Sequence, residues 1–213
     1  MKVGVLGSGD VAKTLASGFL KYKHQVTMGT RDKSKLAEFA AKNKKVKIGS
    51  FADAAQFGQV LVLAVRGSAA LEVLNAAGRE NITGKTVIDP TNPISDEPPA
   101  NGVLKVFTGP NESLMGNLQR EYNDVHFVKA FNCIGTETMV DPKFKKGKPT
   151  MFICGDNVPA KKTVTRICEQ FGWKVADMGV ADAARAIEPL AILWCIPGFL
   201  HKDWGKRAFK MLQ

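Results

Sequence analysis

Short apolar runs alternate along the chain with longer segments in which apolar and polar residues recur at helical spacing. Residues 3–6 and 60–65 form unbroken apolar runs, which are typical of parallel strands buried on both faces of a sheet. Residues 10–21 place apolar side chains on one face of a helix. Repetition of this strand–helix unit predicts an α/β fold with a doubly wound, mostly parallel sheet.

The same criteria place the other elements. Strands are expected at residues 25–28, 46–48, 86–89, 126–131, 150–154 and 173–177, and helices at 36–40, 51–57, 68–77, 112–119, 159–171 and 181–200. Pro189 and Pro197 are expected to kink or interrupt the last helix. Without repeats or a flexible linker, the pattern predicts one domain over 1–213, with a core at 1–140 and a C-terminal α/β extension at 141–213 packed on it.

A glycine-rich turn joins the first strand to the first helix and carries the main chemical signal. Gly7 permits a tight turn, Gly9 lets the backbone approach a pyrophosphate, and the small Ala12 lets the helix pack close to the strand. The pyrophosphate would rest on the free N–H groups at the helix N-terminus. A strand before this motif and a helix after it indicate a dinucleotide-binding, Rossmann-type unit, although a glycine turn of another α/β protein is an alternative.

The end of the second strand indicates which dinucleotide is bound. Enzymes that use NAD place an acidic residue there to bind the ribose 2′-hydroxyl, whereas this chain has Thr30 and Arg31. A hydroxyl and a guanidinium suit a 2′-phosphate, so the sequence predicts NADP. Asp32, which follows, is interpreted as a cap of the next helix.

The composition limits the kinds of partner that we expect this chain to bind. The chain has 213 residues, 45% hydrophobic residues and a formal charge of +10. The lysines are dispersed and lack interleaved aromatic residues, so they are interpreted as solvated surface, and nucleic acid is not expected as a partner. The longest apolar run, 190–200, contains Pro197 and is short for a membrane span. We therefore expect a cytoplasmic protein without a membrane partner. The apolar segment 194–204 predicts a homodimer.

Candidate catalytic residues are scarce. Four scattered cysteines show no metal-binding spacing, so we expect buried thiols and no metal site. None of the three histidines forms a triad-like arrangement. Glu188 is interpreted as a helix-surface acid, with a place in the cleft as the alternative. Asn92 and Asn132 follow strands at the expected ligand edge and could bond to a carboxamide, although Asn92 could equally form a turn. The catalytic residues are therefore left unassigned.

Several segments together resemble the deazaflavin-dependent NADP oxidoreductases of the coenzyme F420 type. They are the glycine turn, Gly29-Thr30-Arg31-Asp32, and the stretches 128–135 and 151–156. The chain is also similar to the cytosolic NADPH-binding domain of the STEAP metalloreductases, which pass hydride to a flavin, and its tail segments 183–190 and 193–194 resemble the corresponding STEAP helix.

The resemblance implies a role for particular residues. It places the pyrophosphate at Ser8, Gly9, Asp10 and Val11, the 2′-phosphate at Thr30, Arg31 and Lys35, and the nicotinamide near Val65, Arg66, Asn132 and Ile134. The chain departs from the deazaflavin enzymes in a glycine loop that is one residue shorter. It also has Val65-Arg66 where some have Pro-Trp, and Phe131-Asn132 where some have Leu-His.

These observations predict an NADPH-dependent oxidoreductase that transfers hydride between NADP(H) and a flavin- or deazaflavin-like co-substrate. Hydride transfer between two cofactors requires mostly orientation, which agrees with the scarcity of proton donors. Two alternatives stay open: reduction of a small imine or carbonyl substrate, and a module that binds NADP without turnover.

Overall fold

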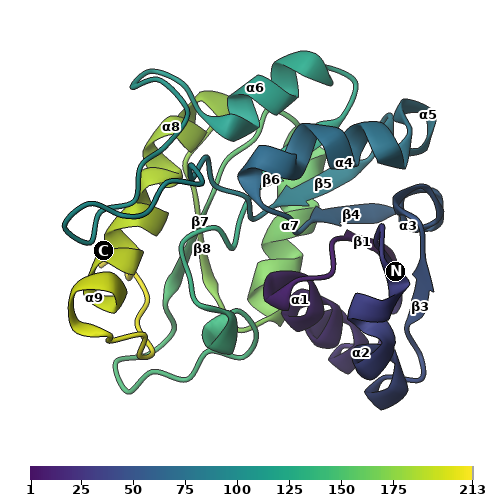
Figure 1. The fold of residues 1–213 in the computed structure, drawn as a ribbon, viewed down its shortest axis with the longest axis horizontal. Coiled ribbons are helices and arrows are strands. Elements are labelled where there is room, and N and C mark those ends of the chain that lie inside the picture. The colour runs from purple at the N-terminus through teal and green to yellow at the C-terminus, as the bar shows by residue number, and fades with distance from the viewer. Residues whose placement is uncertain (213) are drawn as a thin grey trace.

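A six-stranded parallel sheet forms the centre of the computed structural model, which describes residues 1–212 (Figure 1). Its strands lie in the order β3-β2-β1-β4-β5-β6. Their bounds are β1 Lys2–Leu6, β2 Gln25–Gly29, β3 Lys47–Gly49, β4 Val60–Leu63, β5 Thr86–Asp89 and β6 His126–Lys129. The order reverses between β1 and β4, and in such sheets ligands bind beyond the carboxyl ends of the strands at this point. The predicted fold class is confirmed.

Helices cover both faces of the sheet. They are α1 Asp10–Lys21, α2 Ala37–Lys42, α3 Phe51–Phe57, α4 Ala70–Ala77, α5 Arg79–Ile82, α6 Leu114–Glu121, α7 Val158–Gln170, α8 Ala184–Ile187 and α9 Pro189–His201. Alternate strand residues point to opposite faces. Val3 and Val62 therefore share a core with α1 and α7, whereas Leu61 and Leu63 share one with α3, α4, α6 and α8.

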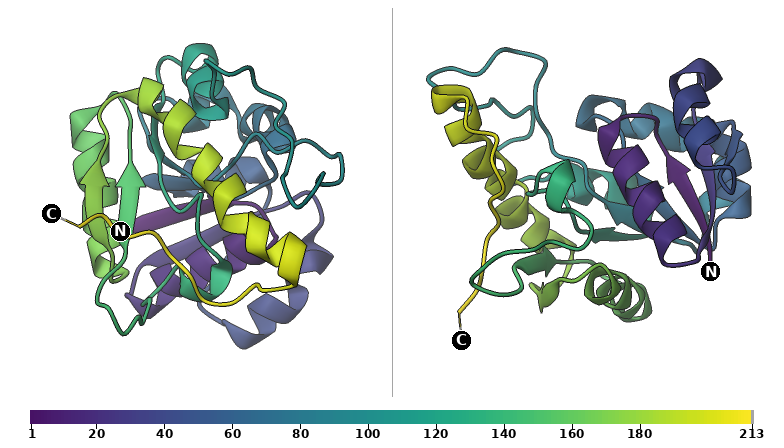
Figure 2. Two further views of the ribbon diagram at one scale, coloured as in Figure 1. Left: turned by 90° about the vertical axis from the view of Figure 1, so that its left-hand side faces the viewer. Right: turned by 90° about the horizontal axis from the view of Figure 1, so that it is seen from below.

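The C-terminal extension adds a small second sheet to the edge of the first. Strand β7 (Thr150–Ile153) pairs in parallel with β8 (Lys174–Asp177). The backbone of Cys154 forms an isolated antiparallel β-bridge with Lys129 at the end of β6. The last residues run back beside α9 (Figure 2), where the Thr150 N–H donates to the Phe209 carbonyl at 2.9 Å.

Some element boundaries differ from the expectations. Two predicted strands end early, at Leu63 and at Lys129, because the chain turns there into the ligand edge of the sheet. Helix α5 was not predicted from the sequence pattern. Pro197 lies inside α9 without ending it, and the helix continues for one turn to His201, although an interior proline removes a hydrogen bond and crowds the carbonyl four residues before it.

The helical segment from Ala181 to His201 bears on the expectation that no apolar segment is long enough to cross a membrane. Glu188, between α8 and α9, has helical backbone angles, so the helical turns follow one another without a break. By length and composition alone this run could cross a membrane, and 28% of its most apolar window is buried. The expectation that no run reaches this length was wrong, because it treated Pro197 as a break. A core helix of a soluble protein passes the same test.

Candidate cofactor site

A cavity of about 490 Å³ lies beyond the carboxyl ends of β1, β2 and β4, at the reversal of strand order. Most of the residues predicted to bind the cofactor line it: Gly7, Ser8, Gly9, Asp10, Val11, Thr30, Arg31, Lys35, Val65 and Arg66. The lining also includes Phe51, Ala69 and Val73, which the sequence did not indicate. The cavity brings together the glycine turn and the loop after β2.

The glycine turn leaves room for a ligand at one end of this cavity. A Cβ on Gly7, whose φ is +143°, would lie 2.1 Å from the Ala64 carbonyl oxygen, so this position requires glycine. A Cβ on Gly9 would meet no protein atom within 4 Å. Gly9 caps α1 without a side-chain hydrogen bond, whereas Ser50, Ser113 and Asn157 cap later helices. The N–H groups of the first turn of α1 are thus available to an anion.

Arg31 and Lys35 provide positive charge at the other end of the cavity. The Arg31 guanidinium pairs with Glu72 of α4 at 2.6 Å, and both side chains are exposed. The Thr30 hydroxyl is engaged within its own loop, since it donates to the Asp32 carbonyl at 3.0 Å and accepts from the Asp32 N–H. Thr30 therefore shapes the loop. Arg31 and Lys35 are the cations that line this end of the cavity and could meet an anionic ligand.

Asp32 caps the following turn, as the sequence predicted. Its carboxylate accepts from the Ser34 hydroxyl at 2.6 Å and from the Ser34 N–H at 2.9 Å. These hydrogen bonds hold the pKa of Asp32 below its ordinary value. Both hydrogen bonds reach Oδ1, which supports the interpretation of Asp32 as a cap, and the residue also lines the cavity.

A second cavity of about 430 Å³ continues from the first and shares Val11, Val65, Arg66 and Pro90 with it. Its further lining is mostly small and polar: Gly67, Ser68, Thr91, Asn92, Ile94, Ser95 and Asp96. The titratable groups in this lining are Arg66 and Asp96, which lie 3.7 Å apart and are both highly exposed. Neither is a buried group with the environment of a tuned proton donor.

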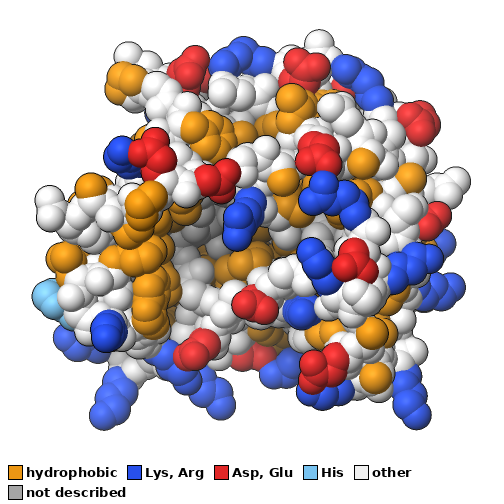
Figure 3. All heavy atoms as spheres, in the orientation of Figure 1, with side chains coloured by type: hydrophobic (Ala, Val, Ile, Leu, Met, Phe, Trp, Pro, Cys, Tyr) orange, Lys and Arg blue, Asp and Glu red, His pale blue; other side chains and the backbone are white. Residues whose placement is uncertain are grey.

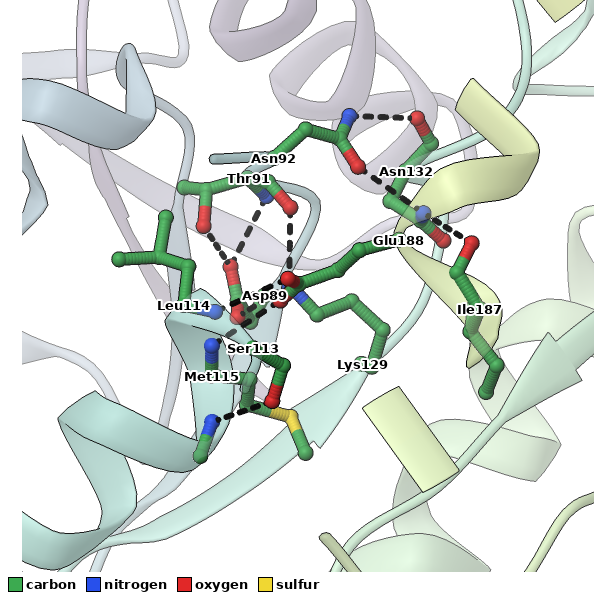
Figure 4. Close-up of polar contacts among 11 residues, drawn as sticks. Asp89, Thr91, Asn92, Ser113, Leu114, Met115, Lys129, Asn132, Ile187 and Glu188 are labelled. Atoms are coloured by element: carbon green, nitrogen blue, oxygen red, sulfur yellow. Dashed lines mark hydrogen bonds and ion pairs between the residues drawn. The ribbon is translucent and has the colours of Figure 1, made fainter. Parts of the chain in front are cut away.

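Asn92 and Asn132 bond to each other beside this second cavity (Figure 4). The Asn92 Nδ2 donates to the Asn132 carbonyl at 2.8 Å, and the Asn132 Nδ2 donates to Asn92 Oδ1 at 3.0 Å and to the Ile187 carbonyl. Asn132 is buried and lines neither cavity, and its Oδ1 has no hydrogen-bond partner in the described chain. Ile134 is also buried, in the core beside α1. Asn132 and Ile134 thus lie behind the cavity wall.

A buried ion cluster supports this wall. The Lys129 Nζ lies 2.7 Å from Asp89 Oδ2 and 2.9 Å from Glu188 Oε1, and all three side chains are almost fully buried. Glu188 also accepts from the N–H groups of Leu114 and Met115, at the N-terminus of α6 (Figure 4). The interpretation of Glu188 as a surface acid was therefore wrong, because a buried cation and a helix N-terminus together stabilise its charge.

The cluster fixes the loop that lines the second cavity. Asp89 Oδ1 accepts from the Thr91 hydroxyl and N–H, and Lys129 donates to the Thr91 carbonyl at 2.8 Å. Burial alone would lower the pKa of Lys129, but the charges of Asp89 and Glu188 outweigh this effect and raise it. Lys129 therefore stays charged and acts as a structural cation.

Other reactive groups lie outside the cavities. All four cysteines are free thiols, and burial raises the pKa of Cys133 and of Cys154 to about 12, so neither is a thiolate nucleophile near neutral pH. His24 contacts the N-terminal amine and Gln170 and lines neither of the two cavities described above. No group of three His, Cys, Asp or Glu residues within residues 1–212 could hold a metal ion.

Comparison with known proteins agrees with this geometry. Residues 2–93 match the family model described as NADP oxidoreductase, coenzyme F420-dependent. A solved structure from Arthrobacter sp. FB24, described as a candidate F420-dependent NADP-reductase, superimposes over the full length of both chains with a TM-score of 0.90 and 30% identity. The chain belongs to this family. It is thus an NADP-dependent oxidoreductase by family.

Two further proteins are more distant relatives: one matches over part of its own length, and the other matches in fold. Metalloreductase STEAP3 from Rattus norvegicus is 28% identical over 204 residues, which are 93% of this chain and 39% of that protein. The chain thus spans well under half the length of the curated relatives that it matches. The imine reductase of Streptomyces aurantiacus superimposes with a TM-score of 0.69 at 16% identity, over 94% of this chain and 63% of that one. This last likeness concerns the fold alone.

Proposed function

We propose that the protein transfers hydride between NADP(H), bound in the first cavity, and a flavin- or deazaflavin-like acceptor that enters the second. The observation that carries the proposal is the continuity of the two cavities at Val11, Val65, Arg66 and Pro90. An extended dinucleotide with its phosphates at the glycine turn would reach this junction with its nicotinamide. A cytoplasmic location, expected from the sequence, belongs to the same proposal.

The residues of the first cavity suit the phosphates of NADP. The open space at Gly9 and the uncapped turn of α1 suit the pyrophosphate. Arg31 and Lys35 suit the 2′-phosphate, since a guanidinium provides several donors for phosphate oxygens. The nicotinamide supplies the hydride when NADPH is bound. Arg66, Val65 and the Asn92 loop would orient the acceptor against it.

The composition of the second cavity favours an acceptor that takes hydride without a protein acid. Its titratable lining is an exposed ion pair, Arg66 with Asp96. A flavin or deazaflavin delocalises the charge that it gains over its own ring system, so the protein needs to supply orientation rather than a proton. An imine or carbonyl substrate would normally require a positioned donor.

Acceptor choice is tested by following the oxidation of NADPH with a flavin, a deazaflavin, and a panel of cyclic imines and small ketones. Turnover with a flavin or deazaflavin at a rate well above that with imines or ketones is the expected result. Faster turnover with imines or ketones would replace the proposed acceptor by the alternative substrate. Tight NADPH binding without turnover of any compound would favour a non-catalytic role.

Ser68→Phe tests whether the acceptor occupies the second cavity. Ser68 is exposed and lines this cavity but not the first, so the larger side chain should raise the KM of the acceptor about tenfold or more and leave NADPH binding unchanged. The matched control is Ser17→Phe, on the exposed side of α1 and outside both cavities. Equal KM values for the two variants would contradict the assignment of the second cavity.

Gly9→Ala separates cofactor binding from folding. The Gly9 backbone is extended (φ −78°, ψ −175°) and an added methyl group would meet no protein atom, so the free energy of unfolding should change by less than about 1 kcal/mol. The affinity for NADPH, measured by fluorescence titration, should fall at least about tenfold because the methyl group occupies the space of the pyrophosphate. Gly7→Ala should instead destabilise the fold. Unchanged NADPH affinity in Gly9→Ala would contradict the assigned site.

A further inference from the structure

Most of the net positive charge of the protein falls in two segments of the C-terminal extension. Residues 142–149 and 201–212 contain seven Lys and one Arg against a single Asp, a net charge of +7 out of +10 for the whole chain. Within the described chain, none of these seven lysines forms an ion pair, and Arg207 pairs with Asp203. The charge is thus free to act on a partner.

The end of the second segment, residues 209–211, lies against the first segment and Thr150. The Lys210 ammonium donates to the Lys146 carbonyl, the Thr150 N–H donates to the Phe209 carbonyl, and the Met211 N–H donates to the Thr150 hydroxyl. Figure 3 shows Lys and Arg side chains gathered at the lower left of the molecule, below the hydrophobic side chains over α9. We call this surface, formed by residues 142–149 and 199–212, the basic corner.

An exposed apolar tip lies at the end of α9, followed by Lys202 and Lys206 and away from the C-terminal end of the tail (Figure 2). Phe199, Leu200 and Trp204, at the end of α9 and just after it, are each 40–50% exposed. The rings of Phe199 and Trp204 meet edge to face at 5.0 Å, and Trp204 packs over Gly198. The tip is therefore held in shape by its own contacts, and it projects where α9 ends (Figure 2).

We propose that the basic corner docks on the surface of an anionic lipid bilayer. Aromatic and aliphatic side chains beside lysines are the combination that binds a lipid interface, where the rings enter the headgroup region and the ammonium groups meet anionic lipids. The proposal goes beyond the hydride chemistry and does not depend on it. It also revises the sequence-based expectation that the protein has no membrane partner.

The observations favour a lipid surface over the other occupants of this corner. A homodimer through the segment 194–204, as the sequence predicted, would bring two identical clusters of positive charge together if the contact were symmetric. Insertion of the helix across the bilayer would remove Glu188 from Lys129, with which it forms a buried ion pair at 2.9 Å. Docking on the surface leaves both the fold and the ion cluster intact.

The test is co-sedimentation of the protein with vesicles of neutral phosphatidylcholine, with and without about one third phosphatidylserine. The wild-type protein should bind the anionic vesicles, and bind less as salt is added. The triple variant Lys145→Gln, Lys148→Gln, Lys206→Gln should bind the anionic vesicles at least about tenfold more weakly. Trp204→Ala should also weaken binding, and the tryptophan fluorescence of the wild-type protein should shift to shorter wavelength on anionic vesicles, a shift that Trp204→Ala should abolish.

A matched control variant tests whether the lysines that bind vesicles must lie in the basic corner. The triple variant Lys44→Gln, Lys45→Gln, Lys47→Gln removes the same charge from exposed lysines just before β3 and at its first residue, at the opposite end of the molecule from α9 (Figure 1). It should bind anionic vesicles like the wild-type protein. Equal weakening by both triple variants, or no binding to anionic vesicles at low salt, would overturn the proposal. A dimer in light scattering that Trp204→Ala dissociates, without vesicle binding, would assign the corner to a second copy of the chain.

Discussion

Replacing Lys129 by Met should lower the free energy of unfolding by about 3–5 kcal/mol. The substitution removes the cation that lies 2.7 Å from Asp89 and 2.9 Å from Glu188. Both carboxylates stay buried, so each would keep its desolvation cost without its partner. Glu188 would retain the N–H groups of α6, which is why the loss should not exceed this range.

Urea unfolding followed by circular dichroism measures this effect, with Lys42→Met as the control. Lys42 pairs with Glu38 on an exposed helix surface, and breaking such a pair should cost less than about 1 kcal/mol. A Lys129→Met protein as stable as Lys42→Met would show that the cluster contributes little.

The buried cluster illustrates what the sequence did and did not reveal. The low frequency of buried glutamate placed Glu188 on the surface, because this criterion considers one residue at a time. A signal was nevertheless present, since Lys129 interrupts an apolar strand between Val128 and Ala130. A lysine in a strand buried on both faces requires carboxylates nearby. Which carboxylates these are depends on how α8 packs, and no local pattern contains that information.

The candidate site also has one part that the sequence predicted and another that depends on tertiary packing. The glycine turn and the loop after β2 were predictable because their roles follow from local backbone geometry and from the position of strand ends in a parallel sheet. Asn132 was predicted at the end of a strand, and it lies in the turn three residues beyond β6. Its side chain points to Asn92 and to the Ile187 carbonyl instead of a cavity, because α8 covers it. The direction of that side chain is a property of tertiary packing.

Arg31→Ala should reduce kcat/KM for NADPH about 10- to 100-fold and change kcat/KM for NADH by less than about twofold, since charge-assisted hydrogen bonds to a phosphate contribute about 1.5–3 kcal/mol. NADH lacks the 2′-phosphate and would not lose this interaction. The Glu72 carboxylate, which pairs with Arg31 at 2.6 Å, would add to the effect, because without its partner it would repel the 2′-phosphate. Steady-state kinetics with both cofactors measures the ratio.

Two further variants assign the effect to the guanidinium and its surroundings. Arg31→Ala combined with Glu72→Gln should recover part of the lost kcat/KM for NADPH, because the repelling charge is removed while the phosphate donors stay absent. Arg166→Ala removes the same charge from an exposed residue of α7, which lines neither cavity, and should leave both cofactors unaffected. Equal losses with NADPH and NADH in Arg31→Ala would mean that Arg31 does not contact the 2′-phosphate. Selection of NADP would then rest on Lys35, the other cation at that end of the cavity.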